Sequence, residues 1–150
     1  MGFQKDQSAG YLTNHLARLF AHRLHDAIAP IGLAPAQFMT LIELWNDDGL
    51  TQAQLVERLD VEQATLANTL KRMERDGLIE RSPHPSDGRS QIICLTEKAR
   101  FLEVPATSAA REISEDALMR LRPADRQSLI RLMQQLLDTM REEKKPARDA

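Results

Sequence analysis

The stretch that specifies the architecture of this chain is QATLANTLKRMERDGLIERSPHPSDGRSQIICLT, residues 63–96. Its first part places Leu66, Leu70 and Met73 three or four residues apart, which is the spacing of one apolar face of a helix. Gly77 follows at the position where a left-handed residue commonly ends a helix. The pattern therefore predicts a helix that begins near position 63 and stops at Gly77.

The second part of the stretch predicts a β-hairpin. Two short apolar runs, Leu78–Arg81 and Gln91–Leu95, flank the turn-forming segment Ser82–Ser90. An arginine at such a tip can enter the minor groove of DNA, and a neighbouring carboxylate can orient its guanidinium. Arg89 and Asp87 have this arrangement. The alternative is an ordinary surface turn, in which an ion pair contributes about 0–1 kcal/mol.

A shorter helix is expected directly before the quoted stretch. Thr51 and Gln54 have the spacing of a capping box, and Leu55, Val56 and Leu59 follow it. Two short helices with matched apolar faces and a tight joint are typical of a helix-turn-helix. The hairpin behind them makes the predicted unit a winged helix.

The polar side of the helix that begins near position 63 carries groups suited to DNA. Amide side chains can bond adenine, arginine can bond guanine, and cations can contact phosphates. An ordinary solvated helix face would also be polar, so this pattern by itself leaves both interpretations open. We predict DNA contacts from Gln63, Thr65, Asn68, Lys71, Arg72, Arg75 and Arg89, with Asp87 orienting Arg89.

Helices are also expected on both sides of the winged helix. Pro105 is expected to kink the helix that follows the hairpin, and residues 122–125 are expected to break the chain before the last helix. The predicted helices are Leu12–Ile28, a second one from Pro35 that ends before Asn46, a third from Thr96 to about Leu121, and a last one with apolar residues from Leu129 to Met140.

Composition bounds the class of protein. The chain has 150 residues, 42% hydrophobic and 28% charged, which suits one soluble domain or one protomer of an oligomer. Its net charge is −2, although residues 63–100 hold seven basic and five acidic side chains. One cysteine excludes an intrachain disulfide, and no apolar run reaches the roughly 18 residues of a membrane span. We expect a cytoplasmic protein.

Motifs for catalysis give no positive signal. The chain has no phosphate-binding glycine loop, nucleophile elbow, paired-carboxylate site or zinc-protease motif. We expect neither an enzyme nor a bound cofactor.

The run from Thr51 to Thr96 resembles the MarR (multiple antibiotic resistance regulator) family of winged-helix transcription factors, and residues 63–96 carry the resemblance. The order of the expected helices is similar to that of the family over nearly the whole chain. The shared features are a recognition helix ending in Leu-x-x-x-Gly-Leu-Ile, an arginine, a proline-containing wing with Asp-x-Arg, and a strand running into Leu-Thr. Ala64 departs from the family, because many relatives have a small hydroxyl residue there. In this sequence the features shared with the family are found at Met73–Ile79, Arg81, Pro83, Pro85, Asp87, Arg89, Leu95 and Thr96.

The resemblance implies a mainly α fold with a small β-hairpin wing. It divides the chain into a helical dimerisation region, residues 1–32 and 97–145, and a winged-helix DNA-binding head, residues 33–96, with a disordered tail at 146–150. It implies a homodimer that binds double-stranded DNA at a palindromic operator as a repressor and responds to a small aromatic or phenolic effector. The alternative is a winged-helix dimer that binds another protein and no longer reads DNA.

Candidate effector-binding residues are His15, His22 and Trp45. The two histidines and Asp26 can share one helix face, but a surface or pocket-lining role is favoured over metal binding, and no metal is expected. Trp45 can line a ligand cleft, but core packing is the favoured role. Cys94 alternates with apolar residues in a predicted strand, so it is interpreted as a packing residue and not as an oxidant sensor.

Overall fold

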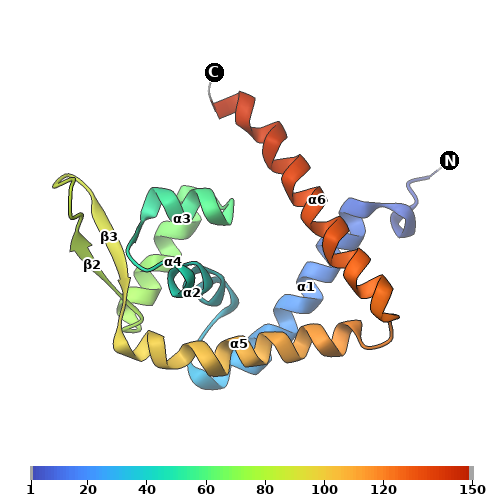
Figure 1. Ribbon diagram of the computed structural model, residues 1–150, viewed down its shortest axis with the longest axis horizontal. Helices are drawn as coiled ribbons and strands as arrows, with labels where there is room; N and C mark the ends of the chain where they lie inside the picture. The colour runs from blue at the N-terminus through green and yellow to red at the C-terminus, as the bar shows by residue number, and fades with distance from the viewer. Residues whose placement is uncertain (1, 149–150) are drawn as a thin grey trace. The chain divides into compact units, whose positions relative to one another are not determined.

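Helices dominate the structure, and a small sheet projects from them (Figure 1). The computed structural model describes residues 2–148. The chain forms two compact units, Met1–Ile113 and Ser114–Ala150, which are described separately. The elements are η1 (Lys5–Gln7), α1 (Ala9–Ile28), η2 (Ala29–Ile31), α2 (Pro35–Asn46), β1 (Leu50–Thr51), α3 (Gln52–Leu59), α4 (Gln63–Arg75), β2 (Ile79–Pro83), β3 (Gln91–Leu95), α5 (Glu97–Leu118) and α6 (Pro123–Arg148).

The sheet has three antiparallel strands in the order β1-β3-β2. The predicted hairpin is present, with Ile79 opposite Leu95 and Pro83 opposite Gln91. The second hairpin strand, β3, has the predicted bounds, whereas β2 begins one residue later than expected and extends to Pro83. The sequence reading missed β1 because two residues are too short to show an alternating pattern.

One hydrophobic core joins the helix-turn-helix to the sheet. Leu41 of α2, Leu55 of α3, Leu70 of α4 and Ile93 of β3 are fully buried together. The predicted apolar face of α4 is confirmed, since Leu66 and Met73 are buried beside Leu70. Burial of this face sets which side of α4 points to solvent.

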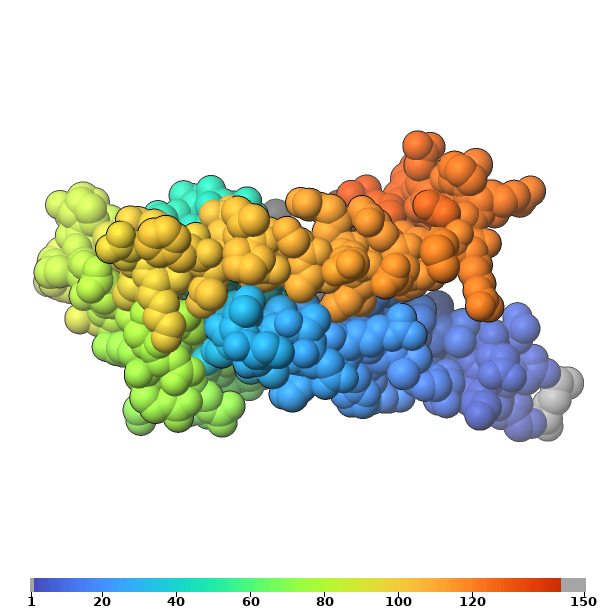
Figure 2. Space-filling model, turned by 90° about the horizontal axis from the view of Figure 1, so that it is seen from below, coloured from blue at the N-terminus to red at the C-terminus, as the bar shows by residue number. Residues whose placement is uncertain are grey.

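The helix α5 continues on both sides of Pro105 from Glu97 to Leu118, and the kink at this proline stays a prediction. On its outer side Phe101 and Val104 are 76% and 72% exposed. Figure 2, the view from below, shows the N-terminal part of α5, in yellow, at the surface. Proline at this site removes one backbone donor.

The second unit contains the end of α5 and the whole of α6. Its last helix begins at Pro123, inside the predicted break, because proline fits the first turn of a helix. Arg122 just before it donates to the carboxylate of Asp125 at 2.9 Å. The backbone stays helical to Arg148, so residues 146–148 of the predicted tail are helical, and residues 149–150 lie outside the described chain.

Within residues 2–148, no single helix is both long and apolar enough to cross a membrane. Ala9–Ile31 and Pro35–Asn46 meet the length and composition requirements only when taken together, and a bend of 77° separates them.

Candidate nucleic-acid interface

A tight turn joins the two helices of the helix-turn-helix. The capping box predicted at the start of α3 is present: the Gln54 amide donates to Thr51 Oγ1 at 3.1 Å, and the Thr51 amide donates to Gln54 Oε1 at 2.8 Å. At the other end Asp60 adopts the left-handed conformation, with φ 53°. Aspartate tolerates this region better than most residues. The chain therefore reverses within three residues and starts α4 at Gln63.

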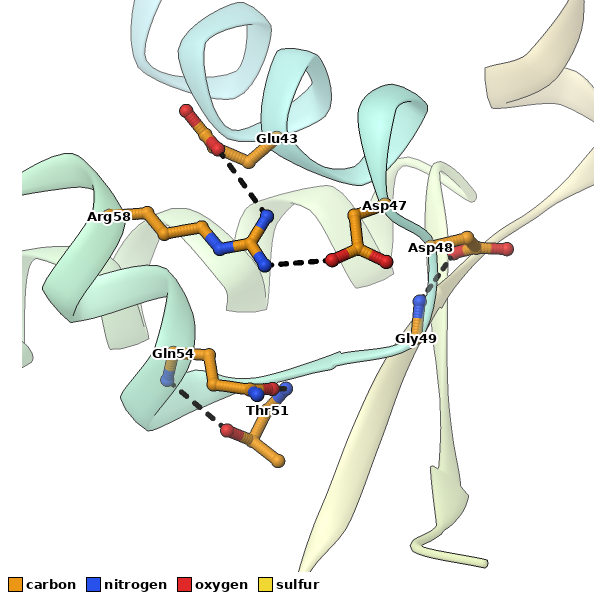
Figure 3. A network of polar contacts seen from close by, with 7 residues as sticks. All are labelled: Glu43, Asp47, Asp48, Gly49, Thr51, Gln54 and Arg58. Atoms are coloured by element: carbon orange, nitrogen blue, oxygen red, sulfur yellow. Dashed lines mark hydrogen bonds and ion pairs between the residues drawn. The ribbon is translucent and has the colours of Figure 1, made fainter.

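Two acidic residues of α2 and its C-cap hold α3 in place (Figure 3). The guanidinium of Arg58 lies 2.7 Å from Asp47 and 3.9 Å from Glu43. These side chains are partly exposed, so each pair stabilises the fold by at most about 1 kcal/mol. Their main effect is geometric, because they set the orientation of α3 against α2.

Asp48 ties the strand β1 to β3 and to α5. Its carboxylate accepts hydrogen bonds from the Gly49 amide at 3.0 Å and the Leu95 amide at 2.9 Å. It also pairs with Arg100 at 3.1 Å. The base of the wing is thus connected to α5 through one side chain.

The outward face of α4 carries the predicted DNA-reading residues. All of them are exposed, and they surround Ala64, which leaves this face uncluttered. Lys71 and Arg72 form no ion pair within the described chain, so their charges are available to an external anion. The exposed predicted residues of α4 are Gln63, Thr65, Asn68, Lys71, Arg72 and Arg75.

Arg75 differs from the other α4 cations because it already has an acidic partner. Its Nε donates to Asp76 Oδ1 at 3.1 Å, and the buried Gln37 donates to Asp76 Oδ2 at 2.9 Å. These two hydrogen bonds, the one from Arg75 first, lower the pKa of Asp76. The Lys98 ammonium donates to the Asp76 carbonyl at 2.8 Å, which links the end of α4 to α5.

The wing consists of β2, β3 and the connecting residues 84–90. Arg89 is exposed at its tip and has no ion-pair partner among the described residues. The Asp87 carboxylate accepts from the backbone amide of Arg89 at 3.1 Å, where the sequence predicted a contact with the guanidinium. The difference arises because a short aspartate side chain reaches the amide two residues ahead, as in an Asx turn. Asp87 therefore shapes the backbone that carries Arg89.

A hollow of about 550 Å³ lies between the wing and the start of α3. Two cations, Arg81 and Arg89, line it, together with the first residues of α3, Gln52 and Ala53. The guanidinium of Arg81 also lies 3.4 Å from Glu74. The sequence reading did not place Arg81 or Gln52 in the site. The available signal was the capping box at Thr51, which marks the start of α3, because helix N-termini attract anions.

The three candidate effector residues lie on α1 and α2. His15 and His22 are exposed on α1, and the His15 ring meets Tyr11 edge-to-face at 6.0 Å. Trp45 packs edge-to-face on Phe38 at 6.1 Å, and its indole N–H donates to the Ala99 carbonyl at 3.0 Å. Trp45 therefore has a structural role between α2 and α5.

Two other sequence interpretations concern metal binding and redox chemistry. Among residues 2–148, no three His, Cys, Asp or Glu side chains come together to hold a metal ion. Burial, followed by the nearby charge of Asp48, raises the pKa of the Cys94 thiol. The thiol thus stays protonated at neutral pH, which makes it a poor nucleophile.

Comparison with known proteins agrees with this geometry. The MarR family profile matches residues 33–91. Over 107 residues the chain is 32% identical to the HTH-type transcriptional repressor NicR of Pseudomonas putida. The matched segment covers 71% of this chain and 68% of NicR.

Two solved structures share the fold. A probable transcriptional regulator from Pseudomonas aeruginosa has a TM-score of 0.80 and 29% identity, covering 89% of this chain and 99% of its own. The transcriptional repressor CouR, solved bound to a 23-mer DNA duplex, has a TM-score of 0.76 and 26% identity, covering 92% and 99%. The mainly helical winged-helix architecture is thereby confirmed, and the chain belongs to the MarR family of transcriptional regulators.

Proposed function

We propose that this protein is a homodimeric repressor that binds a palindromic DNA operator and responds to a small aromatic or phenolic effector. In each protomer α4 enters a major groove, and Arg89 of the wing reaches the adjacent minor groove. Gln63, Thr65 and Asn68 contact bases or nearby phosphates in this proposal. Phosphate or guanine contacts come from Lys71, Arg72 and Arg75.

The observation that carries the DNA-binding part is the exposed side of α4. Burial of Leu66, Leu70 and Met73 turns the amides and cations of this helix outward. The wing adds Arg89, which has no ion-pair partner among the described residues, and the hollow beside it adds Arg81 of β2 and the start of α3. Amides, cations and a helix N-terminus are the groups that bind base edges and phosphates.

Exposed apolar side chains support the homodimer. On α1, Leu16 and Leu19 are 53% and 49% exposed, and on α6 Leu136 and Met140 are 52% and 67% exposed. A water-soluble monomer rarely leaves such rows uncovered, and a second copy of the same chain is the usual partner.

A salt titration of DNA binding tests the function. The probe is a duplex from the region upstream of the protein's own gene, with a scrambled duplex of equal length as the control. We expect tight binding to the upstream duplex only. The slope of log affinity against log salt concentration should become more negative by about 0.9 for each neutralised phosphate. Binding indifferent to sequence would contradict operator recognition and favour the protein-interaction alternative.

Arg89→Ala tests the role of the wing. We expect a weaker operator complex, by about 1–3 kcal/mol, with an unchanged dimer. Arg111→Ala is the matched control, because it removes the same charge from the middle of α5, about 20 Å along the helix from its start. Equal affinities for the two variants would remove the wing from the mechanism.

The effector part rests on the family resemblance, with His15, His22 and Trp45 as candidate binding residues. Trp45 is the only tryptophan in the sequence, so its fluorescence reports directly on that region. We expect an aromatic carboxylic acid that releases the operator also to change this emission. The effector would bind elsewhere if it released the operator without changing the Trp45 emission and if His15→Ala and His22→Ala still responded to it like the wild type.

A further inference from the structure

The imidazole of His84 occupies an unusual place at the start of the wing loop. Its Nδ1 lies 3.1 Å from the Ser86 amide nitrogen and 3.1 Å from the Asp87 amide nitrogen, both of which donate to it. The Ser86 hydroxyl lies 3.3 Å from the same atom. The side chain is half-buried, although the loop around it is exposed. One ring nitrogen thus satisfies two backbone donors.

These contacts form a relay along the loop. The His84 ring holds the amides of Ser86 and Asp87, and the Asp87 carboxylate holds the amide of Arg89 at 3.1 Å. Backbone bonds close the same loop, from the His84 amide to the Ser90 carbonyl at 3.0 Å and from the Ser90 amide to the Asp87 carbonyl at 3.1 Å. The backbone position of Arg89 therefore depends on the acceptor at His84.

We infer that His84 is a positioning residue for DNA binding: its Nδ1, as an acceptor, holds the wing loop in the conformation that presents Arg89. This inference rests on the proposed DNA-binding function. Nδ1 can accept only in the neutral imidazole with the proton on Nε2. Protonation replaces the acceptor by a donor that points at two other donors, so the loop loses both hydrogen bonds.

The charged surroundings of the ring are simple. Asp87 and Arg89 are the charged residues of its own loop, which ends at the uncharged Ser90, and the facing end of β3 contributes the uncharged Gln91. A protonated ring would have an opposite effect if it simply lay on a phosphate, because added positive charge strengthens DNA binding. The pH dependence of affinity therefore separates a positioning role from a direct phosphate contact.

The test compares His84→Ala, His84→Asn and the wild-type protein at pH 8 and pH 5.5. Asparagine can accept from the amides two and three residues ahead, as in an Asx turn, and it does not titrate. We expect His84→Ala to lose about fivefold in operator affinity at pH 8, the factor of one hydrogen bond of typical net strength. His84→Asn should retain wild-type affinity at pH 8. On moving to pH 5.5, the wild type should weaken relative to His84→Asn.

Amide NMR of the free protein provides a readout that does not require DNA. The Ser86 and Asp87 amide protons should show hydrogen-bonded temperature coefficients in the wild type and in His84→Asn, and lose them in His84→Ala. His25→Ala, which removes an exposed histidine of α1, is the matched control for general histidine titration.

The outcomes are distinct. Unchanged amide signals in His84→Ala overturn the inference even if DNA binds well. A wild-type affinity that rises relative to His84→Asn at pH 5.5 also overturns it, in favour of a phosphate contact. Wild-type protein that binds no operator, with the amide signature intact, contradicts the proposed function and leaves the loop-holding role of His84 supported.

Discussion

Asp76 connects three segments of the first unit at the scale of a single residue. Its carboxylate accepts from Arg75 on α4 and from the buried Gln37 on α2, and its carbonyl accepts from Lys98 on α5. Because these bonds favour the ionised form, the pKa of Asp76 lies below its ordinary value of 3.8. The carboxylate therefore stabilises the fold above pH 3.8, and this contribution is lost as the pH falls through the lowered folded-state pKa.

Asp76→Asn is expected to lower the free energy of unfolding by about 1 kcal/mol at pH 7, the strength of a partly exposed hydrogen bond to a charged group. The difference from wild type should shrink below pH 3.8, where the aspartate begins to protonate. Urea unfolding at pH 7 and pH 3, at one protein concentration, measures both. Asp138→Asn on the exposed side of α6 is the control and should change neither value. A difference that persists at pH 3 would contradict the charge-based explanation.

Among the helices, α4 has two sides with different environments. Leu70 is fully buried under the helix, whereas Asn68 is exposed on the side proposed to face DNA. The two residues lie about 160° apart around the axis, since successive residues turn by about 100°. One side of this helix therefore packs in the core, and the opposite side is the one proposed to recognise DNA.

Alanine substitutions should separate these two sides. Leu70→Ala is expected to reduce the free energy of unfolding by about 2–5 kcal/mol, because it leaves a cavity in the core. Asn68→Ala should change stability by less than about 0.5 kcal/mol and weaken operator binding by about 1–3 kcal/mol. Thermal unfolding and DNA titration of both variants provide the measurements. Loss of stability in Asn68→Ala would show that the polar side of α4 supports the fold.

The whole molecule presents apolar rows that a single copy does not cover. On α6 the apolar side chains recur every three or four residues and all are between 38% and 67% exposed. They are Leu129, Ile130, Leu132, Met133, Leu136, Leu137 and Met140. A solvent-exposed row of this kind is stable in a second copy's interface and favours aggregation without one. The functional protein is therefore proposed to be the dimer.

Leu136→Glu should convert the protein to monomer and abolish tight operator binding, because it inserts a charge into the proposed interface. Gln135→Glu adds the same charge about 140° around the helix from the centre of the apolar row, so it should remain dimeric. Light scattering after size-exclusion chromatography measures the mass of each variant. A dimeric Leu136→Glu protein with wild-type affinity would exclude this row from the interface.

Local patterns of residues were enough to predict the main helices and the outward face of α4. Apolar residues at helical spacing must turn to one side to leave water, so burial of Leu66 and Met73 was readable from their positions alone. The capping box at Thr51 was equally readable, because its partners lie three residues apart.

Contacts between segments that are distant along the chain, and the choice of hydrogen-bond donor to Asp87 in the wing loop, became visible only in the folded structure. The two residues of β1 pair with β3 more than 40 positions later, and Gln37 reaches Asp76 across 39 positions. Arg81 joins Arg89 in one hollow because strand pairing places Arg81 and the connecting loop places Arg89. Such pairings depend on how the chain packs in three dimensions, and no local period encodes them.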